Sequence, residues 1–228
     1  AGSIVAWGCG DYDYGQCAVP APNGRFVGIT AGGQHSLGLK SDGSIVTWGN
    51  NEFGQTNIPA PISGFAAIAA GGGHSLGLRS DGSIVAWGSN IIVQNVPAPN
   101  ADFIGIAAGA SHNLGLKYDG PIVGWGNNRA GQTNVPLPNS DFVAVAAGGF
   151  HSLGLKSDAS IVAWGCGECG DFWLCDYGQC DVPTPNSGFV AVAAGDYHSL
   201  GLRSDGSIIA WGCGSPYDYS QCNVPAPN

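Results

Sequence analysis

Eight cysteines carry the clearest chemistry in this sequence, and all of them fall in three loops that follow a Trp-Gly pair. The first loop holds Cys9 and Cys17, the second holds Cys166, Cys169, Cys175 and Cys180, and the third holds Cys213 and Cys222. In two other loops that follow a Trp-Gly pair, the positions of the first and last cysteine hold Asn50 and Thr56, or Asn127 and Thr133. These shared positions predict the disulfides Cys9–Cys17, Cys166–Cys180 and Cys213–Cys222, with Cys169–Cys175 nested inside the second.

A zinc site is the alternative for these cysteines, because Cys166 and Cys169 have the CxxC spacing. A structural zinc ion usually takes four cysteine or histidine ligands. The first and third loops offer only one cysteine pair each, which favours disulfides. Since disulfides persist in oxidising compartments, we expect a secreted protein that holds no metal and no other cofactor.

The histidines and several aspartates could supply acid–base chemistry, but both recur as sets. A catalytic histidine needs a partner that occurs once, so we expect these side chains to form structural hydrogen bonds and turns instead. The sets are His35, His74, His112, His151 and His198, and Asp42, Asp81, Asp119, Asp158 and Asp205. No phosphate-binding loop or nucleophile elbow is present, and residues 11–14 lack the Gly and distal Glu of a calcium loop. The sequence therefore predicts that the protein is not an enzyme.

The histidines reveal the internal repeat that must position these loops. They are spaced by 39, 38, 39 and 47 residues, and Trp7, Trp48, Trp87, Trp125, Trp164 and Trp211 each end a similar phrase. Within a unit the apolar residues have strand periodicity. One copy predicts strands over Phe142–Ala147 (strand A), Ser152–Lys156 (strand B) and Ile161–Trp164 (strand C), with an Asp-Gly type of hairpin between B and C. A short extended piece before a proline follows strand C.

Repeats of about 40 residues that hold a fixed Trp are typical of propeller blades. We therefore predict an all-β fold, a single β-propeller over residues 1–228. Its parts are a half-blade at 1–23 and blades at 26–62, 65–100, 103–139, 142–186 and 189–228. Strand C occurs six times, starting with Ser3–Trp7, whereas strands A and B occur five times. This mismatch predicts a fragment of a six- or seven-bladed protein, an incomplete last blade, or oligomerisation through the unpaired half-blade.

Aromatic residues gather in the loops that would share one face of such a propeller. Successive turns of a meander alternate between the two ends of a blade, so the A-to-B turns and the loops after strand C lie together. Aromatic side chains on loops fixed by disulfides are good binding anchors. The candidate binding residues are Tyr12, Tyr14, Phe53, Phe150, Phe172, Trp173, Tyr177, Tyr197, Tyr217 and Tyr219. The alternative is that the tyrosines only cover the disulfides of their own loops.

Two phrases carry a family resemblance. Trp-Gly-Asn-Asn-x-x-Gly-Gln-Thr-Asn-(Ile/Val)-Pro and Ala-Gly-Gly-x-His-Ser-Leu-Gly-Leu resemble the regulator-of-chromosome-condensation repeat. The short unit and the Val-Pro-Ala-Pro link are most similar to a compact bacterial branch that includes a secreted β-lactamase-inhibitory propeller protein. The resemblance implies a propeller that hosts exchange factors, inhibitors or other binders. The inhibitory relative grips its target through the corresponding face, which implies a binding site on the aromatic loops.

Composition narrows the class of partner. The net charge is −9, and only seven residues are Lys or Arg, which argues against nucleic acid and anionic membrane surfaces. No apolar run approaches the ~18 residues of a membrane span, so no membrane insertion is expected. Three functions remain: recognition of a protein partner, lectin-like binding of a glycan on Trp173 and the tyrosines, and a structural role in an extracellular assembly.

Overall fold

The structure, a computed structural model, describes residues 1–10, 13–89, 94–167, 176–214 and 219–226. These residues form five antiparallel sheets of three strands each, and each sheet follows chain order. The strands are β1 (Phe26–Ala31), β2 (His35–Lys40), β3 (Ile45–Gly49), β4 (Phe65–Ala70), β5 (His74–Arg79), β6 (Ile84–Gly88), β7 (Phe103–Ala108), β8 (His112–Lys117), β9 (Ile122–Gly126), β10 (Phe142–Ala147), β11 (Ser152–Lys156), β12 (Ile161–Trp164), β13 (Phe189–Ala194), β14 (Ser199–Arg203) and β15 (Ile208–Trp211).

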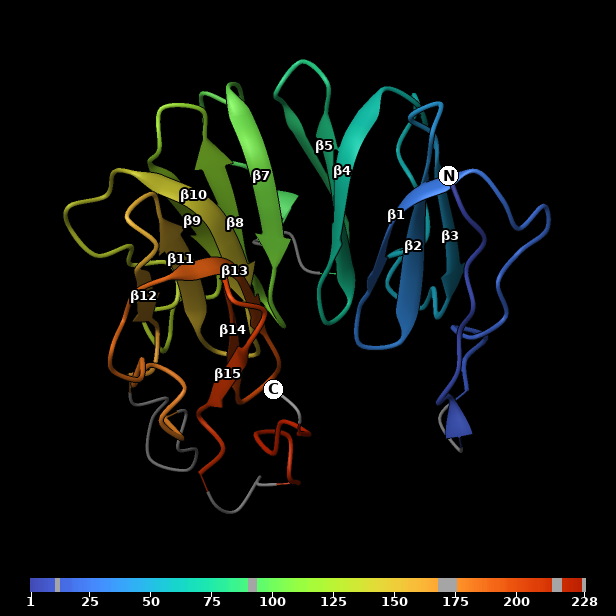
Figure 1. Cartoon of the computed structure of the whole chain (residues 1–228). Coiled ribbons are helices and arrows are strands. Elements are labelled where there is room, and N and C mark those ends of the chain that lie inside the picture. Colours follow the sequence, from blue (N-terminus) through green and yellow to red (C-terminus); the bar gives the residue numbers. More distant parts are fainter. Residues whose placement is uncertain (11–12, 90–93, 168–175, 215–218, 227–228) are drawn as a thin grey trace.

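The five sheets stand side by side as the blades of a propeller (Figure 1). The first strand of each blade contacts the first strand of the next, from β1 through β4, β7 and β10 to β13. Small residues at the ends of these strands line a shared axial cavity of about 480 Å³. This arrangement confirms the predicted all-β propeller, and β10, β11 and β12 have the predicted bounds.

The structure corrects one strand. We expected a strand over Ser3–Trp7, but among the described residues this segment forms no ladder, and only Gly2 is bridged to Phe26. Its backbone still follows the path of strand C, because the side chain of Asn23 accepts from the Ile4 N–H and donates to the Ile4 carbonyl, both at 2.8 Å. A ladder needs a second strand alongside, and the described residues place none beside residues 3–7.

The hydrophobic core is divided among the blade interfaces. In one cluster, Leu114, Leu116 and Ile122 of one blade pack against Phe142 and Trp164 of the next. The Phe142 ring lies over Gly154 of its own blade, where an added Cβ would come within 2.5 Å of the ring. The middle strand must therefore keep a glycine at this position, which explains the repeated Leu-Gly-Leu phrase.

The histidines join neighbouring blades. In four of the five, the ring Nε2 lies within hydrogen-bonding distance of a side chain on the middle strand of the next blade: His35 to Ser75 at 2.9 Å, His74 to Asn113 at 2.7 Å, His112 to Ser152 at 3.0 Å, and His151 to Ser199 at 2.9 Å. The expected structural role is therefore present, but the partner is on another blade instead of within the turn.

Burial sets the protonation state of these histidines. Loss of water contact, together with the smaller effect of neighbouring histidines of the series, lowers the pKa of His35 to about 4, that of His112 to about 3 and that of His151 to about 4. The rings are consequently neutral in the folded protein at neutral pH.

We expect the free energy of unfolding to fall as the pH is lowered from 7 to 5. In that range the unfolded chain protonates its histidines near pH 6.5, while the buried rings stay neutral down to about pH 4. The unfolded state then binds more protons, so stability decreases by up to about 1.4 kcal/mol per pH unit for each such histidine. Urea unfolding at a series of pH values measures the slope, and His112→Asn should make it shallower. A slope of zero between pH 7 and 5 would contradict this assignment.

We also expect Gly154→Ala to destabilise the fold by about 1–3 kcal/mol, because the new methyl group would overlap the Phe142 ring. Gly24→Ala is the matched control, since an added Cβ there meets nothing within 4 Å. Thermal unfolding followed by circular dichroism compares the two variants. Equal melting temperatures would show that the ring can move aside.

Candidate functional site

The A-to-B turns and the loops after the third strands lie at the same end of the blades. In the first blade the N–H of Asn50 donates to the carbonyl of Gln34 at 2.9 Å, and in the third blade the N–H of Asn127 donates to that of Ser111 at 2.8 Å. We call this end the loop face. The hairpins between second and third strands and the proline-containing links form the opposite end, which we call the hairpin face. There the N–H of Phe65 donates to the carbonyl of Gly43 at 3.0 Å.

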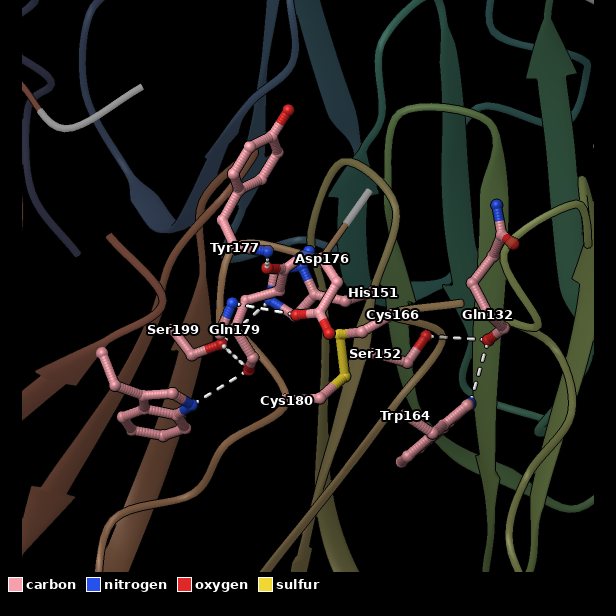
Figure 2. Close-up of a disulfide and its surroundings, with 12 residues drawn as sticks. Gln132, His151, Ser152, Trp164, Cys166, Asp176, Tyr177, Gln179, Cys180 and Ser199 are labelled. Atoms are coloured by element: carbon pink, nitrogen blue, oxygen red, sulfur yellow. Dashed lines mark hydrogen bonds between the residues drawn. A yellow bond between two sulfur atoms is a disulfide. The ribbon is translucent and has the colours of Figure 1, made fainter. Parts of the chain in front are cut away.

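Buried glutamines fix three of the loops to the next blade, and Gln179 is an example (Figure 2). The side-chain oxygen of Gln179 accepts the N–H of Tyr177 at 2.5 Å. Its main-chain carbonyl accepts from Trp211 Nε1 at 2.9 Å and from Ser199 Oγ at 3.0 Å. One residue therefore shapes the loop backbone and joins the loop to the following blade.

The same arrangement recurs in the other loops, which shows that it belongs to the repeat. The carbonyls of Gln16, Gln55 and Gln132 each accept from a tryptophan Nε1 that lies 32 residues further along the chain. The Gly-Gln pair is visible in the repeated phrase of the sequence, but its pattern alone assigns the glutamine no role. Its constant distance of 32 residues from the tryptophan is the signal that could have identified it.

Disulfides close the longer loops next to these glutamines. The structure contains Cys9–Cys17, Cys166–Cys180 and Cys213–Cys222, with Cα atoms 6.1, 6.0 and 6.1 Å apart, and Cys169–Cys175 lies outside the described residues. In a loop without cysteines, a hydrogen bond closes the loop instead: Asn51 Oδ1 accepts the Thr56 N–H at 3.0 Å. The disulfides replace this polar closure in loops that carry insertions.

Three of the predicted binding residues meet on the loop face. The rings of Phe150 and Tyr197 stack with centroids 6.1 Å apart, and Tyr177 meets Tyr197 edge to face at 5.3 Å. Phe150 and Tyr177 belong to the fourth blade and Tyr197 to the fifth. The cluster therefore spans a blade interface, and we call it the aromatic cluster.

The remaining predicted residues are placed separately. Tyr14, Phe53 and Tyr219 precede their loop glutamines by two residues, as Tyr177 does, and their exposed fractions are 49%, 56% and 80%. Phe53 lies over Gly73 of the next blade, in the place where Tyr177 meets Tyr197. Tyr12, Phe172, Trp173 and Tyr217 lie outside the described residues.

Charge is distributed unevenly between the two faces. On the hairpin face, five of the seven basic residues lie over a phenylalanine ring of their own blade: Lys40, Arg79, Lys117, Lys156 and Arg203. Hydrogen bonds from serines lower the carboxyl pKa of the hairpin residues Asp42, Asp81, Asp158 and Asp205. The described loops and turns of the loop face hold Asp13, Glu52, Asp176, Asp181 and Asp196 against a single cation, Arg129. The loop face is therefore acidic.

The described residues contain no candidate metal-binding cluster. No group of three His, Cys, Asp or Glu side chains among them could hold a metal ion. The axial cavity is lined by alanines and glycines from the five blades together with Asp196. The described loop face presents the aromatic cluster and a set of carboxylates.

Comparison with solved structures finds the same fold in proteins of several kinds. The ectodomain of the Physcomitrella patens receptor kinase CR4 matches with a TM-score of 0.70 and 25% identity over 89% of this chain and 55% of that chain. The ectodomain of the Arabidopsis thaliana receptor kinase ACR4 matches with 0.61 and 28% identity over 86% of this chain and 68% of that one. Prp20p from Saccharomyces cerevisiae, described with its binding to Gsp1p and histones, matches with 0.69 and 20% identity over 85% and 58%.

The chain spans just over half the length of the CR4 ectodomain and of Prp20p. A search of curated protein sequences finds no match. The pattern of the regulator of chromosome condensation (RCC1) repeat, however, matches residues 26–55, 65–91, 103–132, 142–171 and 189–217, which together make up more than half of the chain. This protein belongs to the RCC1 repeat family.

Proposed function

We propose that this protein is a secreted, non-enzymatic binding module that recognises a protein partner through its loop face. The observation that carries the proposal is the aromatic cluster. Its three residues are half-buried, and Gln179 and the Cys166–Cys180 disulfide hold the backbone beneath Tyr177. Aromatic anchors that are ordered before binding lose little entropy when a partner docks, and such anchors dominate protein interfaces.

The uneven charge points to the chemistry of the partner. Most basic side chains of the chain already bond to carbonyls or cover rings on the hairpin face, as Lys156 does with the carbonyls of Pro138 and Ser140. The carboxylates of the loop face therefore have few internal counter-ions. A partner that presents arginine or lysine would meet both carboxylates and the faces of aromatic rings.

Secretion is supported by the disulfides, because such bonds persist in oxidising compartments. Among the described residues, no helix could cross a bilayer. Two of the similar folds are ectodomains of receptor kinases. We also propose that, within the repeat family, this protein is related to the compact bacterial branch that its short unit resembles.

To test the binding face, the wild-type chain and the double variant Phe150→Ala/Tyr197→Ala are immobilised and exposed to extracellular medium from the source. We expect the bound protein to be lost from the double variant, with an affinity decrease of at least about tenfold, because two central anchors are removed. The matched control is Tyr118→Ala, which removes an exposed ring from the hairpin face and should leave binding unchanged.

Two results would contradict the proposal. Equal loss of binding in Tyr118→Ala would show that the loop face is not specific. Retention of the wild-type chain on a glycan array, abolished by Phe150→Ala/Tyr197→Ala, would replace the protein partner with a carbohydrate.

The disulfides have a test of their own. We expect the denatured but unreduced protein to take up no iodoacetamide, and the denatured and reduced protein to take up eight equivalents, because all eight cysteines are paired in our assignment. Intact-mass spectrometry counts the adducts. Uptake by Cys169 and Cys175 without reduction would remove the nested pair, and uptake at all positions would remove the argument for secretion.

A further inference from the structure

The axial cavity of about 480 Å³ lies at the loop-face end of the innermost strands, next to the aromatic cluster. Its wall consists of small residues at the ends of these strands, among them Gly109, Gly148 and Gly195. Within the part of the chain that the structure describes, Asp196 is the only lining residue with a charge, and it directly precedes Tyr197. The volume falls in the range of about 300–1,000 Å³ that is typical of ligand pockets.

The fold does not require the carboxylate of Asp196. The four preceding blades hold only glycine or alanine at the same position of the repeat: Gly33, Gly72, Ala110 and Gly149. The contact that the blades share there is made by the main chain, because the N–H of Gly149 donates to the carbonyl of Asp196 at 3.2 Å. The Asp196 side chain is exposed. A charged side chain that departs from the repeat, on a turn held by a rigid scaffold, is a candidate for binding.

Histidine rings lie directly behind the glycines of the wall. An added Cβ at Gly109 would come within 2.6 Å of Nδ1 of His112, and one at Gly148 would come within 2.6 Å of Nδ1 of His151. Both rings are fully buried, and among the described residues neither Nδ1 atom has a hydrogen-bond partner. The wall is thus backed by two polar atoms that the protein leaves unsatisfied, which is rare for buried groups.

The hydrogen bonds on the other side of the ring fix which nitrogen carries the proton. The hydroxyl of Ser152 donates to the carbonyl of Gln132 at 2.8 Å, so it accepts from Nε2 of His112. His151 has the equivalent bonds. In a neutral ring with the proton on Nε2, Nδ1 carries a lone pair. The edge of each ring that faces the wall is consequently the negative end of the imidazole dipole.

The cavity therefore combines negative charge and acceptors without a cation of its own. No basic side chain lines it among the described residues. Burial lowers the pKa of His198 against the opposing effect of the Asp196 carboxylate, so this neighbouring ring is neutral at pH 7 and does not balance the charge. A cleft whose walls carry one sign of charge concentrates ions of the opposite sign. The complementary ligand is a cation with several N–H donors.

We propose that the axial cavity binds an arginine side chain of the protein partner, with the guanidinium on the Asp196 carboxylate and the aliphatic stem against the alanines of the wall. The planar guanidinium pairs with a carboxylate through two parallel hydrogen bonds, and it is more weakly hydrated than an ammonium group. A polypeptide that contacts Tyr197 lies beside Asp196 and can insert the side chain. The proposal rests on the proposed function of the loop face, and it names the chemistry that the partner presents there.

The test uses the intact, ¹⁵N-labelled chain and two synthetic peptides, acetyl-Gly-Gly-Arg-Gly-Gly-amide and the same peptide with citrulline in place of arginine. Citrulline has the shape of arginine but no charge. In ¹H–¹⁵N correlation spectra, the arginine peptide should shift the amide signals of Gly148 and Gly195 and saturate with a dissociation constant on the order of 1 mM. The citrulline peptide should bind at least about tenfold more weakly, because it loses the charge-assisted hydrogen bonds.

Two matched variants locate the site. Asp196→Asn keeps the shape of the side chain and should weaken binding of the arginine peptide at least about tenfold. Asp119→Asn is the control, because it also removes one exposed carboxylate but lies on the hairpin face, where Asn-Gly suits the turn as well as Asp-Gly does. It should leave the dissociation constant unchanged. Thermal melts check that both variants fold.

Three results would overturn the proposal: no saturable shift with the arginine peptide, equal binding of the citrulline peptide, or an equal effect of the two variants. Agmatine, a free guanidinium compound, separates the two sources of this chemistry. Binding of agmatine without binding of the arginine peptide would assign the cavity to a small molecule and overturn its assignment to a side chain of the partner.

A failure of the proposed function is distinguishable from a failure of this proposal. If Phe150→Ala/Tyr197→Ala retained the extracellular partner while the arginine peptide still required Asp196, the proposed function would fall and the ligand chemistry of the cavity would stand. If Asp196→Asn captured the partner as well as the wild-type chain does, the assignment of the cavity would fall and the aromatic cluster would stand.

Discussion

The structure depends on a main-chain carbonyl that is shared between blades. In each fully described interface, the carbonyl of a loop glutamine accepts from a tryptophan indole, and from the serine of the middle strand, both on the next blade. The glutamines Gln55, Gln132 and Gln179 are buried. A buried carbonyl without partners would cost about 1–3 kcal/mol, so the ends of these three loops are fixed by the packing of the following blade.

This constraint separates the scaffold from the surface it carries. The glutamine anchors the end of the loop, so residues between the Trp-Gly pair and the glutamine can vary in number. Where insertions are present, a disulfide such as Cys166–Cys180 restores the closure that Asn51 and Thr56 give in a plain loop. The aromatic cluster forms because Tyr177 is held at the blade interface beside a turn that carries another ring, Tyr197.

Packing between neighbouring blades also explains the difference in burial between the two ends of the described chain. In a repeat protein, each unit completes its core with residues of the units beside it. Ile4 is buried because Phe26 of the next blade covers it, whereas Ile208 at the other end is 38% exposed because no described blade follows. The exposure of Ile208 therefore reflects the lack of a described neighbour on that side.

The sequence by itself determined the strands, the hairpins and the three described disulfides. Identical phrases within one chain align themselves, so Asn50 and Thr56 identify the cysteines that face each other, and the Leu-Gly-Leu phrase gives the middle strand. Only the tertiary structure decided that His151 bonds to Ser199, that Phe150 meets Tyr197, and that Ser3–Trp7 forms no ladder. The physical reason is distance along the chain. The contacts of His151 and Phe150 join groups 48 and 47 residues apart on different blades, and periodicity reports the order within a blade but not how neighbouring blades pack.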